Sequence, residues 1–302
     1  MTRYEGNISA YKTISILGHC FEGTAVVHLA KHISSGAMVA IKKFDMDKIK
    51  EGAHLVEREI ILTKQLHHSN LITYHTAFVS GPDVCVVSPL MAYGSCRDLL
   101  SRHFNDGLPE QAIITIIRDV FDGLDYLHRK GYIHRAIRAS HILISAAGRA
   151  CLSGLRYACP IVLNGRWQRS IHSFPATNGT EPFAGMSKTL MLTEKVRGCI
   201  PQLLDSTTLP RNENMECSGD CEVSNNVVNR RFSEDLHELA GLCLHREAYD
   251  RPTAGQLLTH PVFKTHKKSL TLPELLRPAL PLSDRVAYDT GIFTMKFFND
   301  EV

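Results

Sequence analysis

The chain has 302 residues, of which 44% are apolar and 22% charged, and its formal net charge is +3. At about 100 to 200 residues per domain, this length predicts one large domain or two modest ones, and the composition excludes disulfide-stapled peptides and wholesale disorder. The charge is too balanced for a dedicated nucleic-acid-binding protein, so we expect no nucleic-acid partner.

The first part of the chain, residues 11–88, is predicted to form a small β-rich lobe with one helix. A helix is predicted over residues 55–66, where apolar side chains recur at near-helical spacing. Three apolar runs separated by glycine-containing turns have the pattern of antiparallel strands, namely residues 14–17, 25–30 and 38–41.

A larger, α-rich lobe is predicted over residues 92–264. Pro109 stands at a typical first helical position, apolar residues follow at helical spacing, and Gly131 supplies the stop. Ser233 is a good N-cap for a later helix, and helical patterning resumes near residues 256–258. The polar stretch 205–231 has too few apolar residues to offset its ordering entropy and is predicted to be a mobile insert. For the C-terminal tail, residues 265–302, the pattern does not assign a fold, and its role is left open.

The nine cysteines are scattered without regular spacing, and the first residues contain no apolar leader. We therefore expect reduced thiols in a cytosolic or nuclear protein. No apolar run approaches the about 20 residues needed to cross a bilayer, so we expect no membrane partner. Cys217 and Cys221 have no second Cys or His pair at zinc-binding spacing, so we expect no metal site.

Two motifs in the small lobe are typical of nucleotide-phosphate binding. Residues 17–23 look like a degenerate glycine-rich loop, in which Cys20 would crowd the approach of phosphate to the backbone; an ordinary hairpin turn is the alternative. Residues 39–42, Val-Ala-Ile-Lys, end a strand in the order that protein kinases use for the phosphate-gripping lysine. Glu59 on the next helix is placed to pair with Lys42, and solvated surface charges are the alternative.

Residues 133–141, Ile-His-Arg-Ala-Ile-Arg-Ala-Ser-His, look like a kinase catalytic loop without its general base. Ala136 stands where kinases have the aspartate that accepts the substrate proton. His141 replaces a metal-binding asparagine, and imidazole is a poor ligand for Mg²⁺. Residues 154–156, Gly-Leu-Arg, replace Asp-Phe-Gly, which removes the second metal ligand.

These replacements predict negligible kinase activity, because a positioned base alone contributes about 10²- to 10⁴-fold in rate and Mg²⁺ supplies further charge stabilisation. Nucleotide binding is a separate question. Lys42, Arg138 and Arg156 could offset triphosphate charge directly, so metal-independent ATP binding is a fair hypothesis.

The altered motifs resemble one pseudokinase family, the sterile-20-related kinase adaptors (STRAD), over residues 11–278. The similarity is carried by residues 91–95, 139–145, 152–156 and 272–278. It implies an α+β, bilobal protein-kinase-like fold over residues 11–264. The cleft in which ATP is hypothesised without Mg²⁺ has two sets of expected positions. Its degenerate catalytic positions are Ala136, Arg138, His141, Gly154, Leu155 and Arg156. Its nucleotide-binding positions are Leu17, Gly18, Gly23, Val26, Ala40, Lys42, Glu59, Met91 and Leu143.

The same resemblance implies a function in the cytoplasm and nucleus as an allosteric activator. Such an adaptor binds a Ser/Thr kinase, the liver kinase tumour suppressor, together with a helical-repeat scaffold protein. A residually active Ser/Thr kinase and a truncated, non-functional isoform are the alternative interpretations.

Two features depart from the family pattern. Residues 175–181 pass directly over the Ala-Pro-Glu segment and the central hydrophobic helix of the large lobe, about 40 residues of the kinase pattern. We therefore expect an incomplete large lobe, a helix at 109–129 with one packing surface missing, and an Arg251 without its usual glutamate partner. The family's Trp-Glu-Phe ending is absent, which predicts weaker scaffold binding, and Trp167 is predicted to be an ordinary packing residue.

Overall fold

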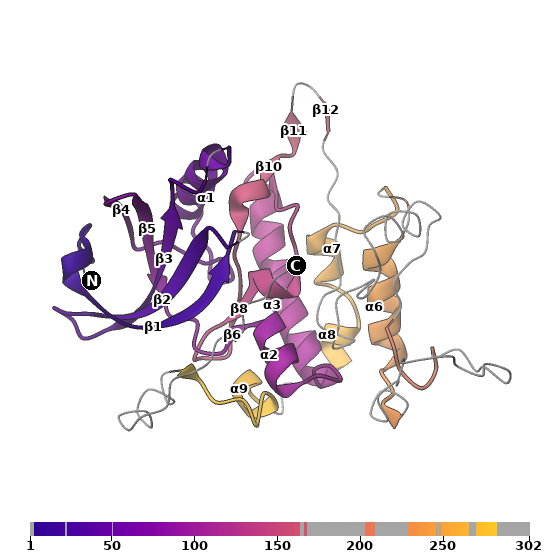
Figure 1. Cartoon of the computed structure of the whole chain (residues 1–302). Coiled ribbons are helices and arrows are strands. Elements are labelled where there is room, and N and C mark those ends of the chain that lie inside the picture. Colours follow the sequence, from indigo (N-terminus) through magenta and orange to yellow (C-terminus); the bar gives the residue numbers. More distant parts are fainter. Residues whose placement is uncertain are drawn as a thin grey trace, which may run out of the picture.

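The structure is a computed structural model that describes residues 3–21, 23–49, 51–163, 166–167, 203–208, 229–245, 247, 249–265 and 270–282. The predictions for residues 175–181, for Cys217 and Cys221, for the Trp167 side chain and for the C-terminal ending lie outside these residues. The described chain forms a five-stranded sheet with one helix, followed by a larger, mainly helical lobe (Figure 1). This arrangement confirms the predicted α+β class and its two lobes.

The small lobe is an antiparallel sheet with strand order β1-β2-β3-β5-β4. Because side chains alternate between the faces of a strand, Val39 and Ile41 of β3 lie in one apolar cluster and Phe44 in another on the opposite face. Lys42 lies on the Phe44 side of β3, with its Nζ 4.5 Å from the Phe44 ring centre. The strand bounds are β1 Tyr11–Cys20, β2 Ala25–His32, β3 Met38–Asp45, β4 Thr76–Ser80 and β5 Asp83–Pro89.

The helix of the small lobe, α1 (Ala53–Gln65), packs on the Phe44 face of the sheet. It begins two residues before the predicted start and ends one residue before the predicted end. Val56 is buried against Phe44, and Glu59 lies one turn further along the same helix face. The packing of α1 therefore turns the Glu59 carboxylate toward β3 and leaves that residue only 1% exposed.

The larger lobe is built around α3 (Glu110–Arg129). It contains a three-stranded sheet of order β6-β8-β9 and the two-stranded pairs β7 with β10 and β11 with β12. The other element bounds are η1 Ile8–Ala10, β6 Gly94–Ser95, α2 Cys96–His103, β7 Tyr132–Ile133, η2 Ala139–His141, β8 Ile142–Ile144, β9 Ala150–Leu152, η3 Leu155–Tyr157, β10 Cys159–Pro160, β11 Val162–Leu163, β12 Arg166–Trp167, α6 Glu234–Leu244, α7 Ala254–Leu257, α8 Val262–Thr265 and α9 Leu272–Leu275.

The apolar residues of α3 are buried along its whole length, including Ile113, Ile117 and Leu127. The helix contacts β7, β9, α7, α8 and α9. These three side chains of α3 are therefore buried, although the helix was predicted to lack one packing surface. As predicted, α3 ends before Gly131, whose φ of +83° is a conformation that favours glycine. In the described part of the chain, no helix combines the length and apolar character needed to cross a membrane.

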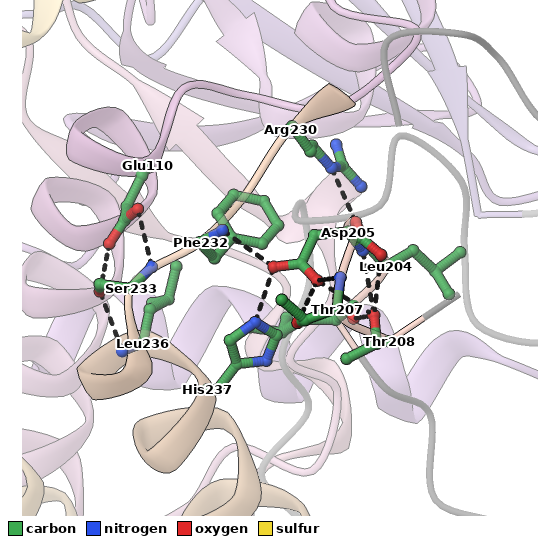
Figure 2. Close-up of polar contacts among 11 residues, drawn as sticks. Glu110, Leu204, Asp205, Thr207, Thr208, Arg230, Phe232, Ser233, Leu236 and His237 are labelled. Carbon is green, nitrogen blue, oxygen red and sulfur yellow. Dashed lines mark hydrogen bonds and ion pairs between the residues drawn. The ribbon is translucent and has the colours of Figure 1, made fainter. Parts of the chain in front are cut away.

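The first residues of the predicted mobile insert belong to the folded core, which corrects that prediction (Figure 2). Asp205 is fully buried, and its Oδ2 accepts hydrogen bonds from Phe232 N at 2.9 Å and from His237 Nε2 at 2.8 Å. Its Oδ1 accepts from the backbone N–H and the hydroxyl of Thr207. Burial alone would raise the pKa of Asp205, but these hydrogen bonds outweigh it and lower the pKa well below the usual range. A polar sequence is ordered here because one carboxylate satisfies several buried donors.

The last residues of the predicted insert are ordered as well. Arg230 donates from Nε to Leu204 O at 2.7 Å and from Nη1 to Asp106 O. Ser233 caps α6 as predicted, and Glu110 at the start of α3 accepts hydrogen bonds from the Ser233 backbone and hydroxyl. The two ends of the stretch are thus fastened to each other and to α3 (Figure 2).

Arg251, which was predicted to lack its usual glutamate partner, has another partner. It is half-buried, and its Nε donates to His245 O at 2.7 Å. A backbone carbonyl after α6 therefore accepts a hydrogen bond from this guanidinium.

The structure describes residues 270–282 of the tail, a segment to which the sequence pattern assigned no fold. Thr271 begins α9 with a capping box, in which its backbone N–H donates to Glu274 Oε2 at 2.6 Å. Leu272 and Leu276 are one turn apart and are buried in the core of the larger lobe. This segment folds because its leucines find a surface on residues far away in the sequence.

Candidate functional site

The residues predicted to line the cleft lie on the small sheet, on the loop before β8 and on the segment after β9. The Lys42–Glu59 pair expected from the sequence is present, with Nζ 2.8 Å from Oε1. Tyr74, which sequence reasoning did not single out, donates its hydroxyl to the same Oε1 at 2.7 Å. No local motif marks Tyr74, because it reaches Glu59 only through the folding of the sheet onto α1.

Both members of this pair are held in their charged forms. Burial would raise the pKa of Glu59, but the charge and hydrogen bond of Lys42 and the hydroxyl of Tyr74 outweigh it, and the pKa is lowered. Burial would likewise lower the pKa of Lys42, but Glu59 outweighs that cost and raises it. The carboxylate is therefore committed to the lysine and is not available as a general base.

The loop of residues 133–141 is fixed by two buried histidines. His134 is fully buried, its Nε2 donates to Ser153 O at 2.9 Å, and its Nδ1 accepts from Ala136 N at 3.2 Å. Burial lowers the pKa of His134 to about 4, so the ring is neutral at pH 7. Ala136 is thereby held in place, and its methyl side chain presents no proton acceptor to the cleft.

His141 is the nearest titratable substitute for the missing base, and its environment disables it. Its Nδ1 donates to Ala136 O at 2.6 Å, while Arg138 Nη2 lies 3.2 Å from its Nε2. Burial, together with the positive charge of Arg138, lowers the pKa of His141 to about 3. A ring with so low a pKa, whose remaining lone pair faces a guanidinium, is a very weak base and a poor metal ligand.

Gly154 lies directly against the His141 ring. A Cβ at position 154 would lie 2.9 Å from His141 Cε1, and Gly154 has a φ of +79°. The imidazole thus fills the space that a carboxylate side chain at position 154 would need. Within the described ranges, no group of three or more His, Cys, Asp or Glu side chains could hold a metal ion.

Arg156 contacts the turn between β1 and β2. Its guanidinium lies 4.5 Å from the Phe21 ring centre and 5.1 Å from that of Tyr157. Phe21 has a φ of 57° and packs edge-on against Phe44 at 5.8 Å. Arg156 is only 8% exposed, and its Nε has no hydrogen-bond partner among the residues that the structure describes.

Phe21 is the residue that sequence reasoning missed in the degenerate glycine-rich loop. Cys20, which we expected to crowd the loop, is the last residue of β1, and burial raises the pKa of its thiol. Gly23 takes up a φ of +79° in the turn, while the Cβ direction of Gly18 is open, with nothing within 4 Å. The residue of this turn that contacts both Arg156 and Phe44 is Phe21.

The remaining predicted positions lie on the strands and the segment that joins the lobes. Met91 and Leu143 pack together with Ile72 and Cys151 in one small apolar cluster. The strands β1, β2 and β3 carry the other positions, namely Leu17 and Gly18, Val26, and Ala40. The structure brings Met91 and Leu143 together.

Two cations act on the buried carboxylate of Glu59. Lys42 forms an ion pair with it, and the positive charge of Arg156 also lowers its pKa, whereas Arg138 lies against His141.

Comparison with known protein families identifies the first half of the chain. The protein kinase domain model matches residues 11–156, which contain both the small lobe and the cleft loops. The two-lobed α+β structure is thus that of a protein kinase domain.

Curated relatives match over nearly the whole chain. STE20-related kinase adapter protein alpha of Gallus gallus is 34% identical, and the alignment covers 94% of this chain and 88% of the relative. The alpha protein of Homo sapiens is 32% identical, with 91% and 78% covered, and the beta protein of Homo sapiens is 30% identical, with 91% and 82% covered. The first alignment runs over 344 positions, so the relative has at least 42 positions without a counterpart among these 302 residues.

Proposed function

Because this chain belongs to the STE20-related kinase adapter family, we propose that it is a non-catalytic adapter that binds a partner Ser/Thr kinase and activates it allosterically. The names of its relatives support the adapter role and imply a partner protein. We further propose that the partner is the liver kinase tumour suppressor and that a helical-repeat scaffold protein joins the complex, in the cytoplasm and the nucleus. These specific partners rest on the family resemblance alone.

One observation carries the non-catalytic part of the proposal. Ala136 stands where the kinase pattern has the proton-accepting aspartate, and the neighbouring His141 is a neutral ring with a pKa of about 3. Loss of a positioned general base costs about 10²- to 10⁴-fold in rate. Since the ring of His141 also blocks side-chain growth from Gly154, both metal-binding positions are lost together.

We propose that the cleft binds ATP without Mg²⁺. Lys42, Arg138 and Arg156 would face the triphosphate, with the base between Ala40, Met91 and Leu143. In an enzyme, Mg²⁺ neutralises the phosphate charge and stabilises the transferring group; here fixed cations would supply only the first of these effects. Nucleotide would then act as a structural ligand that favours one conformation of the adapter.

The adapter role is tested by co-purification with the liver kinase, with and without the scaffold protein. The expected result is a complex in which the kinase phosphorylates its substrate faster than the kinase alone does. The same experiment uses a second chain that carries the family's Ala-Pro-Glu segment and central helix, inserted after residue 175. A failure of both chains to bind the kinase would contradict the proposal, whereas binding by the lengthened chain alone would make the present chain the non-functional isoform.

The alternative of a residually active kinase is favoured by one observation, the intact Lys42–Glu59 ion pair, which active kinases require. Transfer of radiolabelled phosphate to a generic protein substrate tests it. The adapter proposal expects a signal equal to that of Lys42→Ala. A signal in the purified wild type that disappears in Lys42→Ala would favour the enzyme.

A further inference from the structure

The ordered part of the tail runs from the larger lobe to the segment that joins the two lobes. After α9 the chain continues to Leu282, whose backbone N–H donates to the carbonyl oxygen of Ala92 at 2.6 Å. Ala92 follows Met91 in the connection between β5 and β6, which we call the hinge and define as residues 90–93. A segment far away in sequence therefore contributes a backbone hydrogen bond to the hinge.

The other end of this segment is firmly anchored. Leu276 is fully buried, and Leu272 and Ala279 are each 3% exposed, all within the core of the larger lobe. The turn between β8 and β9 approaches α9 so closely that a Cβ on Gly148 would lie 2.3 Å from Pro273 Cδ. The segment is thus packed at α9 and hydrogen-bonded at Leu282, as expected for a brace between two points.

The hinge that this segment contacts contains Met91, one of the positions expected to bind nucleotide. Met91 packs against Leu143 and Cys151, and its carbonyl oxygen accepts from Gly94 N at 2.9 Å. Tyr93 N donates to Ile144 O at 3.1 Å, which ties the end of the hinge to β8. These two bonds fix Met91 and Tyr93, and the bond from Leu282 is the one that fixes Ala92 between them.

From this geometry we infer that residues 270–282 act as a strap that holds the hinge in the conformation required for nucleotide binding. The part that concerns nucleotide rests on the proposed function, whereas bracing of the hinge does not. Residues 270–282 lie outside the region that the protein kinase domain model matches. With the strap, a segment near the C-terminal end therefore positions residues of the cleft.

The test is hydrogen exchange of the hinge amides in the full chain without nucleotide. Leu282→Pro removes the N–H donor, and Leu282→Ala, which keeps the donor but shortens the same side chain, is the matched control. Since one hydrogen bond is worth about 2- to 10-fold in an opening equilibrium, exchange of the Tyr93 and Gly94 amides should be about 2- to 10-fold faster in Leu282→Pro than in Leu282→Ala. Equal rates in the two variants would overturn the inference.

A second pair of variants loosens the strap at its other end. Gly148→Ala places a methyl group against Pro273. Gly81→Ala is the control, because Gly81 also has a positive φ but its Cβ direction has nothing within 4 Å. Faster hinge exchange in Gly148→Ala than in Gly81→Ala supports the strap, and equal exchange contradicts it.

ATP titration in EDTA then separates the two parts of the inference. In a chain that binds ATP, the dissociation constant should be about 2- to 10-fold larger for Leu282→Pro than for Leu282→Ala. An unchanged constant would overturn the positioning role even if exchange were faster. If the wild type binds no ATP, the proposed nucleotide site fails, and hinge exchange alone decides whether the strap braces the hinge.

Discussion

The imidazole of His141 and the bare α-carbon of Gly154 are complementary: a Cβ at position 154 would lie 2.9 to 3.0 Å from three atoms of the ring. The two positions come from different loops, and each replaces a metal-binding residue of the kinase pattern. The His141 ring occupies the space that a side chain at position 154 would need. A carboxylate introduced at position 154 alone would therefore collide with this ring. The residue types at positions 141 and 154 are therefore coupled through packing.

We expect this contact to make Gly154→Ala more destabilising than the strain of its positive φ alone would. Gly131→Ala is the control, since Gly131 has a similar φ of +83° but nothing within 4 Å of its Cβ direction. We expect each to lose about 1 kcal/mol to backbone strain, and Gly154→Ala to lose about 2 kcal/mol more to overpacking. Denaturant unfolding measures both values.

The excess loss in Gly154→Ala should disappear in a His141→Ala background, because the methyl group then has room. A double-mutant cycle gives this coupling energy directly. Equal losses for Gly154→Ala and Gly131→Ala would mean that the His141 ring moves aside at no cost.

The low pKa of His141 predicts a specific pH dependence of stability. The unfolded ring takes up a proton near its ordinary pKa of 6.5, whereas the folded ring stays neutral until the pH approaches about 3. The unfolded state therefore binds more protons in this window, and the free energy of unfolding falls as pH is lowered from 6.5, by about 1.4 kcal/mol per pH unit for each such histidine.

His134 has the same sign and adds to this slope down to a pH of about 4. Replacing one ring, in His141→Asn, should reduce the slope of the free energy of unfolding between pH 6 and 4.5 by about 1.4 kcal/mol per pH unit. Urea titrations at several pH values in this window provide the measurement. An unchanged slope would show that the folded His141 ring already carries a proton there.

Metal-free nucleotide binding predicts that ATP raises the melting temperature in the presence of EDTA. At a concentration 100 times the dissociation constant, the stabilisation is about 2.7 kcal/mol. Lys42→Ala should lose most of this shift relative to its own unliganded baseline, because it removes a cation from the phosphate end of the cleft.

Lys48→Ala is the matched control for this titration. Lys48 also precedes α1 in the chain, but its side chain is 68% exposed. It should keep the full ATP shift. No stabilisation of the wild type, or the same shift in Lys42→Ala and Lys48→Ala, would count against the nucleotide site.

The buried carboxylate of Asp205 should be important for the stability of the larger lobe. Asp205→Asn turns one acceptor oxygen into a donor that faces the N–H or hydroxyl groups of Phe232 or Thr207. We expect a loss of about 2 to 3 kcal/mol, typical of leaving a buried partner unsatisfied. Chemical unfolding of Asp205→Asn beside Ser206→Ala, an exposed neighbour, measures it; similar values for the two variants would refute the role of Asp205.

Periodicity and motif order predicted the small sheet, α1, α3 and the Lys42–Glu59 pair, because each depends on residues close in sequence or on a spacing typical of one fold. The prediction of a mobile insert was wrong for residues 205–208 and 229–231, and the sequence pattern assigned no fold to residues 270–282. Asp205 is polar, yet it is buried because donors from Thr207, Phe232 and His237 satisfy it. Leu276 lies among prolines, yet it is buried in the core of the larger lobe.

The sequence by itself determined which chemistry is absent from the cleft, because Ala136 and Gly154 have no carboxylate in any fold. Only the tertiary structure decided what replaces it. His141 is made a neutral, weak base by burial and by Arg138, and Phe21 stacks on Arg156 across the cleft. Protonation and packing depend on which distant residues exclude water from a group, and a one-dimensional pattern does not contain that information.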